Sequence, residues 1–230
     1  MIDHTLEARA SSNKPGFFLS LDGPDGGGKT TQAAWLADWL RQKGFEVVTC
    51  RDPGATPLGD QLRRILLDRE TANLSLRAEM LLYMASRAQL VEEVIRPALN
   101  DGKIVISDRF LLANIVYQGY AGGLPTSEIG QVGLTATGHL LPDLTLVLDI
   151  PIELARSRVG GARDRIEDRP SDYQARVREG FRKAAERAAQ GGSPDYPAPV
   201  TLIDASVAPE LVRSRLQSEV EGVLALRSRT

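Results

Sequence analysis

Residues 23–30 read Gly-Pro-Asp-Gly-Gly-Gly-Lys-Thr and match the phosphate-binding loop pattern G-x-x-x-x-G-K-[ST] at every fixed position. Before the loop, residues 17–22 are an apolar stretch of strand length, and after it residues 30–43 carry apolar side chains at helical spacing. Glycines let the backbone turn its N–H groups toward an anion at the helix N-terminus. Lys29 supplies a charge for the β- and γ-phosphates, and the Thr30 hydroxyl is a ligand for Mg²⁺. We therefore expect a nucleoside triphosphate site here, in preference to a glycine-rich turn without a ligand.

The composition narrows the class of protein. The 28 basic and 30 acidic residues give a formal net charge of −2, which argues against non-specific nucleic-acid binding. The single cysteine, Cys50, excludes an intramolecular disulfide and a multi-cysteine zinc site. No apolar run reaches the roughly 18 residues of a membrane span, and residues 1–15 lack the apolar stretch of a signal peptide. We expect a soluble cytoplasmic enzyme with a disordered tail over residues 1–15, followed by one domain over residues 16–230.

Strand-like and helix-like segments alternate along the 230 residues. This order predicts an open, five-stranded parallel sheet of the P-loop NTPase type with helices on both faces. The predicted strands are residues 17–22, 46–51, 103–107, 144–149 and 200–204. The predicted helices are residues 30–43, 58–69, 76–100, 112–120, 127–140, 152–158, 171–190 and 209–226. Because ligands bind beyond the carboxyl ends of such strands, we expect functional residues directly after each strand.

Charged residues follow two of these strands. Arg51 ends the second predicted strand, where an arginine can bind a phosphate through two hydrogen bonds, although a surface arginine in a turn is the more common occurrence. The third strand runs into Asp108 and Arg109. An aspartate at this place is typical of the second acidic element of P-loop enzymes, which holds Mg²⁺. The adjacent arginine is then placed to reach a transferred phosphoryl group.

Residues 156–169 contain five arginines, interrupted by Gly160 and Gly161. A solvated helix end accounts for many such runs, but the paired glycines break the helix and favour a mobile, arginine-bearing lid over about residues 157–169. Such a lid excludes water and stabilises charge on the transferred group. Elsewhere, Tyr83 and Arg87 are four apart on one helical face, which suits either a base-binding pair or a core tyrosine beside a surface arginine.

With these residues in view, the chain resembles the thymidylate kinases from about residue 17 to residue 205. The order and spacing of seven markers carry the resemblance, and together they are more specific than any one of them. The markers are residues 23–31, 51–59, 83–89, 107–110, 117–120, 164–167 and 202–205.

The resemblance implies ATP-dependent phosphorylation of dTMP to dTDP, with Mg²⁺ as cofactor, a homodimer as the assembly, and neither nucleic acid nor membrane as partner. The implied catalytic residues are Lys29, Asp108, Arg109, Arg158 and Arg163. The implied ATP-binding residues are Gly23, Asp25, Gly26, Gly27, Gly28, Lys29, Thr30, Thr31, Arg156 and Ala205. The implied acceptor-binding residues are Asp25, Arg51, Tyr83, Arg87, Arg109, Asn114, Tyr117 and Gln118. The implied metal ligands are Thr30, Asp25, Asp108 and Glu167.

The resemblance also assigns roles within the acceptor site. Arg51 and Arg109 would hold the dTMP phosphate, and Tyr83 would stack on thymine. Arg87 would hydrogen-bond a ring carbonyl, while Asn114 and Gln118 would line the base pocket. Tyr117 would crowd the 2′ position and so favour deoxyribose.

The chain departs from the family pattern in ways that bear on subtype and on acceptor choice. Some members carry a catalytic arginine in the loop where this chain has Gly26, so the arginine is expected from the lid. Arg156, Arg158 and Arg163 are the candidates, with Arg158 first. Asp52 replaces the usual glutamate, Ala55 replaces a glycine, and Ala113 replaces a hydroxyl residue. The alternatives are a kinase for another nucleotide or deoxynucleoside and, in a different class, a slow nucleotide-dependent switch.

Overall fold

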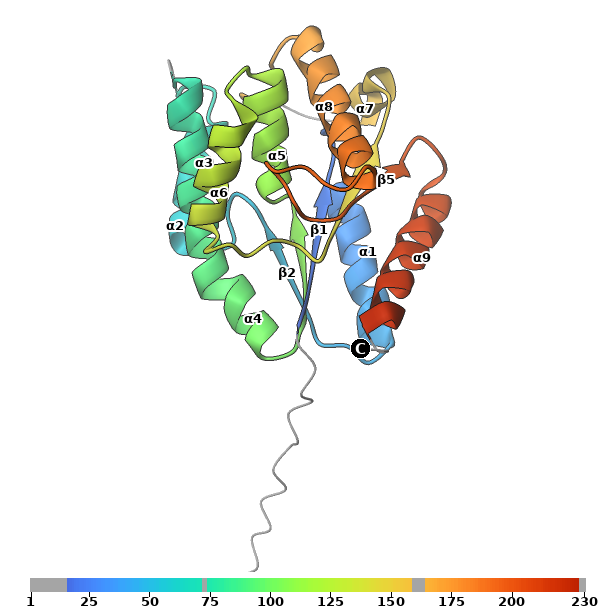
Figure 1. Cartoon of the computed structure of the whole chain (residues 1–230). Coiled ribbons are helices and arrows are strands. Elements are labelled where there is room, and N and C mark those ends of the chain that lie inside the picture. Colours follow the sequence, from blue (N-terminus) through green and yellow to red (C-terminus); the bar gives the residue numbers. More distant parts are fainter. Residues whose placement is uncertain (1–15, 72–73, 159–163, 228–230) are drawn as a thin grey trace, which may run out of the picture.

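The structure is a computed structural model that describes residues 16–71, 74–158 and 164–227 (Figure 1). The predicted tail over residues 1–15 and the first half of the predicted lid therefore lie largely outside the described residues. The strands of the described chain are β1 (Phe17–Asp22), β2 (Val47–Arg51), β3 (Ile104–Asp108), β4 (Leu144–Asp149) and β5 (Val200–Asp204). They form one parallel sheet in the order β2-β3-β1-β4-β5, which confirms the predicted architecture.

The register of the sheet brings the strand ends to one level. Arg51 of β2 pairs with Asp108 of β3, and Asp108 in turn pairs with Leu21 of β1. On the other side of β1, Asp22 pairs with Val147 of β4. The residues that follow β1, β2 and β3 therefore emerge side by side at one edge of the sheet, as parallel strands require.

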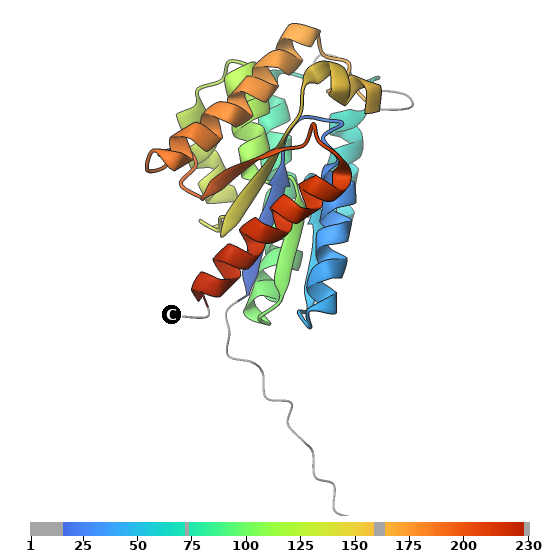
Figure 2. The same cartoon turned by 90° about the vertical axis from the view of Figure 1, so that its right-hand side faces the viewer.

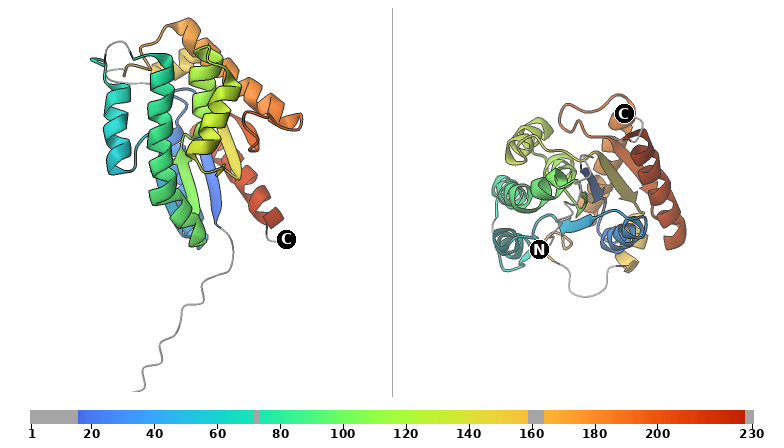
Figure 3. Two further views of the ribbon diagram at one scale, coloured as in Figure 1. Left: turned by 60° about the vertical axis from the view of Figure 1, so that its left-hand side comes forward. Right: turned by 90° about the horizontal axis from the view of Figure 1, so that it is seen from below.

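Helices cover both faces of the sheet (Figure 3). Alternate residues of β1 separate two cores, with Phe17, Leu19 and Leu21 on one side and Phe18 on the other. The first core includes α1 (Lys29–Gln42), α7 (Ile152–Arg158) and α9 (Pro209–Arg227). Figure 2 shows α9 lying across this face, with α7 at the upper end of the sheet.

The second core is covered by helices from the middle of the chain and by α8. Its elements are α3 (Leu76–Leu90), η1 (Val91–Ile95), α4 (Arg96–Asn100), α5 (Leu111–Asn114), η2 (Ile115–Ala121), α6 (Thr126–Ala136) and α8 (Ser171–Ala189). Helix α2 (Pro57–Leu67) packs beside α3.

Several predicted boundaries are wrong by a few residues, and the helix predicted over residues 76–100 is interrupted by the π-helical segment η1. Pro97 follows closely, and a proline removes one backbone hydrogen bond from a helix. The helix predicted over residues 127–140 ends at Ala136, because Gly138 and His139 adopt φ angles of 54° and 60°. Neither change moves a strand end.

Candidate active site

Glycines shape the loop between β1 and α1 at points of close backbone approach. Gly23 has a φ of 129°, and a Cβ atom there would lie 2.5 Å from the Leu148 carbonyl oxygen. Gly26 has a φ of 79°, and a Cβ atom there would lie 2.3 Å from the Ala155 carbonyl oxygen in α7. Gly28 is the N-cap of α1 with a φ of 83°. The loop thus meets the helix N-terminus in a form suited to phosphate binding, and α7 packs directly on its backbone.

Lys29 begins α1 and is almost fully buried. Its Nζ donates to the Pro24 carbonyl at 2.8 Å and lies 3.7 Å from Oδ1 of Asp25. Burial, together with the nearby charge of Arg109, lowers the pKa of Lys29 from 10.5 to about 8. Thr31, two residues into the helix, is exposed. Lys29 is therefore a cation held against the loop, where a phosphate would meet it.

Thr30 and Asp108, two of the four predicted metal ligands, are in direct contact. The Thr30 hydroxyl donates to Oδ2 of Asp108 at 2.6 Å. Oxygen atoms of this kind suit Mg²⁺, which takes few protein ligands because water and phosphate complete its shell. Among the described residues, no three His, Cys, Asp or Glu side chains gather as a metal site. The donor set therefore fits a magnesium ion shared with phosphates better than an ion enclosed by protein.

Arg109 follows β3 and directs its guanidinium to the loop. Nη1 donates to the Gly23 carbonyl at 2.8 Å, and Nη2 donates to Asp25 and to the Tyr117 hydroxyl. The Tyr117 hydroxyl also donates to Oδ2 of Asp25 at 3.1 Å. Although burial opposes ionisation, the charges of Arg109 and Lys29 lower the pKa of Asp25 to about 2. Asp25 is therefore an ionised carboxylate between two cations.

A cavity lies beside this ion pair, and both Asp25 and Arg109 line it. We call it the central cavity. Every predicted acceptor-binding residue except Arg51 lines it. Its lining residues are Asp25, Asp52, Pro53, Arg63, Leu67, Tyr83, Arg87, Arg109, Ala113, Asn114, Tyr117, Gln118, Asp164, Ile166 and Glu167.

One wall of the central cavity is a buried row of polar side chains. Arg87, which is 1% exposed, donates from Nε to Asp52 and from Nη2 to Oδ1 of Asn114, each at 2.5 Å. Nδ2 of Asn114 then donates to Oε1 of Gln118 at 2.7 Å. Burial raises the pKa of Asp52, and the Arg87 charge opposes that rise. This wall offers a polar, fixed surface to the edge of a planar ligand.

Arg51 is the predicted acceptor residue that the structure places elsewhere. Its guanidinium is exposed and donates to Oδ1 of Asp60 on α2 at 3.1 Å. Arg63, from the same helix, lines the central cavity instead, and its Nη1 donates to the Pro53 carbonyl at 3.0 Å. Arg63 of α2 therefore joins Arg87 and Arg109 as the third arginine of the central cavity, and sequence spacing does not reveal it.

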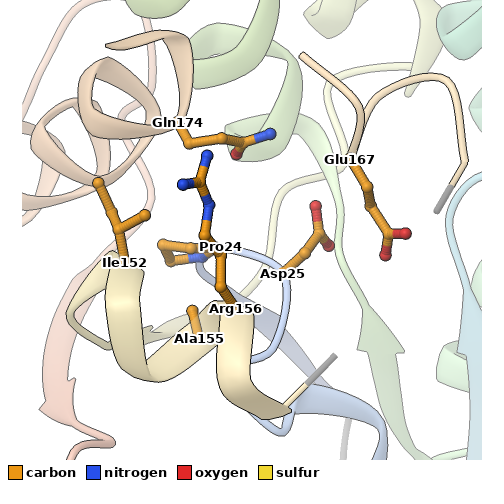
Figure 4. A pocket seen from close by; sticks show the side chains of 7 residues that line it. All are labelled: Pro24, Asp25, Ile152, Ala155, Arg156, Glu167 and Gln174. Carbon is orange, nitrogen blue, oxygen red and sulfur yellow. The ribbon is translucent and has the colours of Figure 1, made fainter. Parts of the chain in front are cut away.

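The predicted lid arginines are divided between two places. Arg156 lines a second cavity, beside Asp25 and Glu167, and Figure 4 shows its guanidinium directed toward Gln174 of α8. Nη1 of Arg158 donates to the Ala205 carbonyl, just beyond β5, at 3.0 Å. Arg163 lies outside the described residues. Because Asp25 and Glu167 line both cavities, these two carboxylates mark the boundary between them.

Comparison with known proteins identifies the family. The thymidylate kinase family model matches residues 21–191, about three quarters of the chain. This chain belongs to the thymidylate kinase family. Family members are nucleoside monophosphate kinases, so the chain is a phosphotransferase.

Individual relatives are similar to this chain over most of its length. A thymidylate kinase of Desulfovibrio desulfuricans is 40% identical over 92% of this chain and 98% of its own length. One from Rhodopirellula baltica is 48% identical over 73% of this chain and 68% of its own length. The crystal structure of an Ehrlichia chaffeensis thymidylate kinase superposes with a TM-score of 0.70 at 28% identity, covering 90% of this chain and 99% of that one.

For this thymidylate kinase family member, sequence reasoning missed several groups at the site. Arg63, Asp52 and Asp164 line the central cavity. Arg63 lies in none of the seven markers, whereas Asp52 and Asp164 lie in the markers at residues 51–59 and 164–167 but have no role assigned from the sequence. Glu79, whose carboxylate contacts Gln118, was also missed. One signal could have found it: Glu79 lies one helical turn before Tyr83, on the face that carries Tyr83 and Arg87.

Asp22, also missed, supports a prediction about stability. It is fully buried; Oδ2 accepts from the Ser20 hydroxyl at 2.7 Å, and Oδ1 has no hydrogen-bond partner among the described residues. Burial raises its pKa from 3.8 to about 6, although the Arg109 charge opposes the rise. The folded state thus holds this proton more tightly than the unfolded state, so stability falls as pH rises through this window.

We therefore expect Asp22→Asn to raise the free energy of unfolding near pH 8 by up to about 3 kcal/mol. The gain should vanish below about pH 4, where Asp22 is protonated in both states. Urea unfolding of both proteins across this pH range measures the difference. An equal gain at every pH would show that the charge of Asp22 is not its cause.

Proposed function

We propose that this enzyme transfers the γ-phosphoryl group of ATP to dTMP and releases dTDP. The observation that carries the proposal is the meeting of the phosphate loop and the central cavity at Asp25 and Arg109. A nucleoside monophosphate needs cationic groups for its phosphate and fixed polar groups for its base. The central cavity offers the first at Arg109 and the second along the wall of Arg87 and Asn114.

The proposed division of labour follows from the charges. The loop amides and Lys29 hold the ATP phosphates, while Arg109 holds the acceptor phosphate and neutralises charge in the transition state. Thr30 and Asp108 would hold Mg²⁺, which would supply positive charge to neutralise the phosphates. The acceptor phosphate is already ionised near neutral pH, so the protein needs no general base. Positioning and electrostatics are then the whole task of these residues.

We assign the binding of the acceptor to two arginines, which contact its phosphate, and to the polar wall of Arg87, Asn114 and Gln118, which faces its base. Arg63, which lines the central cavity, is the second arginine that we assign to the acceptor phosphate. Arg51 stays a prediction that requires its pair with Asp60 to open. Tyr83 is the proposed stacking partner of thymine, and the position of Tyr117 beside Asp25 supports its proposed role against a 2′-hydroxyl.

For the donor side, we assign the ATP base to the region where Arg158 contacts Ala205, beyond the end of β5. Arg156 shares a cavity with Asp25, and this supports Arg156 as the lid arginine that reaches the transferred phosphoryl group. The sequence favours Arg158 over Arg156 for that role. The catalytic roles of Arg158 and Arg163 stay predictions. Glu167, at the boundary of the two cavities, stays a predicted contributor to the metal shell.

The assembly and the location also belong to this proposal. Exposed leucine and isoleucine side chains on α2 and α3 support a homodimer through these helices. They are Leu58, Ile65 and Leu81, between 44% and 50% exposed. No helix among the described residues is long and apolar enough to span a membrane. The single domain over residues 16–230 and a cytoplasmic location stay predictions.

An acceptor panel tests the proposed function. ADP release from ATP and Mg²⁺ is measured with dTMP, dUMP, UMP, dCMP, GMP, AMP and thymidine as separate acceptors, and with no acceptor as the control. We expect dTMP to give the highest kcat/KM, and ATP without an acceptor to give almost no ADP release. Preference for another monophosphate would overturn the acceptor assignment, and ADP release that is equal with and without acceptor would favour a nucleotide switch.

A further inference from the structure

Glu79 is a buried carboxylate at which two parts of the central cavity meet. It lies in the first turn of α3 and is 0% exposed. Its oxygens accept hydrogen bonds from Nε2 of Gln118 at 2.7 Å, from Nη2 of Arg165 at 2.6 Å, and from Nη2 of Arg169 at 2.9 and 2.7 Å. A buried carboxylate with this set of partners is strongly coupled to each of them.

The two arginines belong to the segment 164–169, which contributes Asp164, Ile166 and Glu167 to the lining of the central cavity. Arg165 also donates from Nε to the Leu66 carbonyl at 2.9 Å and from its backbone N–H to the Leu67 carbonyl at 3.2 Å. These bonds tie the segment to the end of α2. Glu79 ties the same segment to α3, through both of its oxygens.

A series of hydrogen bonds through two side-chain amides also connects Glu79 to Arg87, and every bond in it is donated in the same direction. Arg87 donates to Asn114, Asn114 donates to Gln118, and Gln118 donates to Glu79. A guanidinium can only donate and a carboxylate can only accept, so the two ends of this series fix the orientation of both amides between them. Glu79 is therefore the acceptor that completes the base-side wall of the central cavity.

We propose that Glu79 is a positioning residue for the acceptor: it holds segment 164–169 as one wall of the central cavity and fixes the Gln118 amide in another. This inference rests on the proposed function, because the acceptor is taken to be dTMP. A glutamine at position 79 has one oxygen to share among three donor side chains, and its amide N–H groups face the Arg165 and Arg169 guanidinium groups as donor against donor. Segment 164–169 and the Gln118 amide then both lose the hydrogen bonds that fix their positions.

Steady-state kinetics of Glu79→Gln tests the proposal. We expect the KM for dTMP to rise by about 10- to 100-fold, because misplaced walls weaken acceptor binding. The KM for ATP and kcat should stay within about threefold of wild type, which is the pattern of lost binding energy. A loss of folded protein would lower the apparent kcat and leave the KM for dTMP unchanged, so the two causes are separable.

The matched control is Asp149→Asn. Asp149 is also held by two arginines, Arg178 and Arg182 of α8, but it does not line the central cavity. Its variant should keep the wild-type KM for dTMP. If Glu79→Gln folds poorly, Arg165→Gln removes one of the two ion pairs of Glu79 while Glu79 stays intact, and it should also raise the KM for dTMP.

Hydrogen exchange of the peptide covering residues 164–169 gives a readout that needs no activity. We expect faster exchange in Glu79→Gln than in wild type or Asp149→Asn. A wild-type KM for dTMP combined with wild-type exchange would overturn the inference. If the wild-type enzyme does not phosphorylate dTMP, the proposed function is wrong. The comparison of hydrogen exchange rates still decides whether Glu79 holds segment 164–169 in place.

Discussion

Replacing Arg109 with alanine lowers kcat by about 10³-fold or more, if the guanidinium stabilises charge on the transferred phosphoryl group as we propose. Arg109 is the cation that joins the Gly23 carbonyl, Asp25 and the Tyr117 hydroxyl at the end of the central cavity. Its loss leaves Asp25 with Lys29 as its remaining close cation, 3.7 Å away. Coupled measurement of ADP release at saturating ATP and dTMP gives the change in kcat.

Arg109→Lys is the matched control for this prediction. Lysine keeps the positive charge but lacks the planar set of donors that reaches Gly23, Asp25 and Tyr117 together, so we expect only part of the activity to return. Thermal unfolding checks that both variants are folded. A kcat for Arg109→Ala within about tenfold of wild type would remove Arg109 from the transition state.

The second large effect concerns stability. Arg87→Met keeps most of the side-chain volume but leaves the Asp52 carboxylate, 2% exposed, without its ion-pair partner. We expect the free energy of unfolding near neutral pH to fall by about 3 to 5 kcal/mol, the usual cost of an uncompensated buried charge. The KM for dTMP should rise as well, since Asn114 loses its donor. Denaturant unfolding measures the first effect, and kinetics the second.

A double-mutant cycle isolates the charge pair. Asp52→Asn combined with Arg87→Met removes both charges, and this protein should be more stable than Arg87→Met alone. Losses that simply add in the double variant would contradict the ion-pair explanation. The acceptor KM should stay high in the double variant, because the base wall lacks Arg87 in both proteins.

The sequence predicts the sheet and most of the central cavity for a definite physical reason. Parallel strands align their carboxyl ends, so Asp108 at the end of β3 and Arg109 directly after it had to emerge beside the loop that follows β1. The helical spacing of Tyr83 and Arg87 likewise had to place both on one face. Local pattern and topology were sufficient for these residues.

Arg51 and Glu79 show where local pattern is insufficient. Arg51 ends a strand in the right register, but Asp60 on the next helix pairs with its guanidinium, and no periodicity reports that choice. The role of Glu79 depends on Arg165, which lies 86 positions further along the chain and returns to α3 only in the folded protein. Long-range polar partners of this kind are fixed by packing.

The contact between Gly26 and α7 bears on how this enzyme could be re-engineered. Some members of the family carry an arginine at this point of the loop. Here a Cβ atom at position 26 would meet the Ala155 carbonyl oxygen at 2.3 Å, on a backbone whose φ of 79° suits glycine. A loop arginine therefore cannot be introduced by one substitution, because helix α7 must first be moved further from the loop. A backbone rearrangement, and not a point mutation, separates an enzyme with its catalytic arginine in the loop from one with that arginine in the lid.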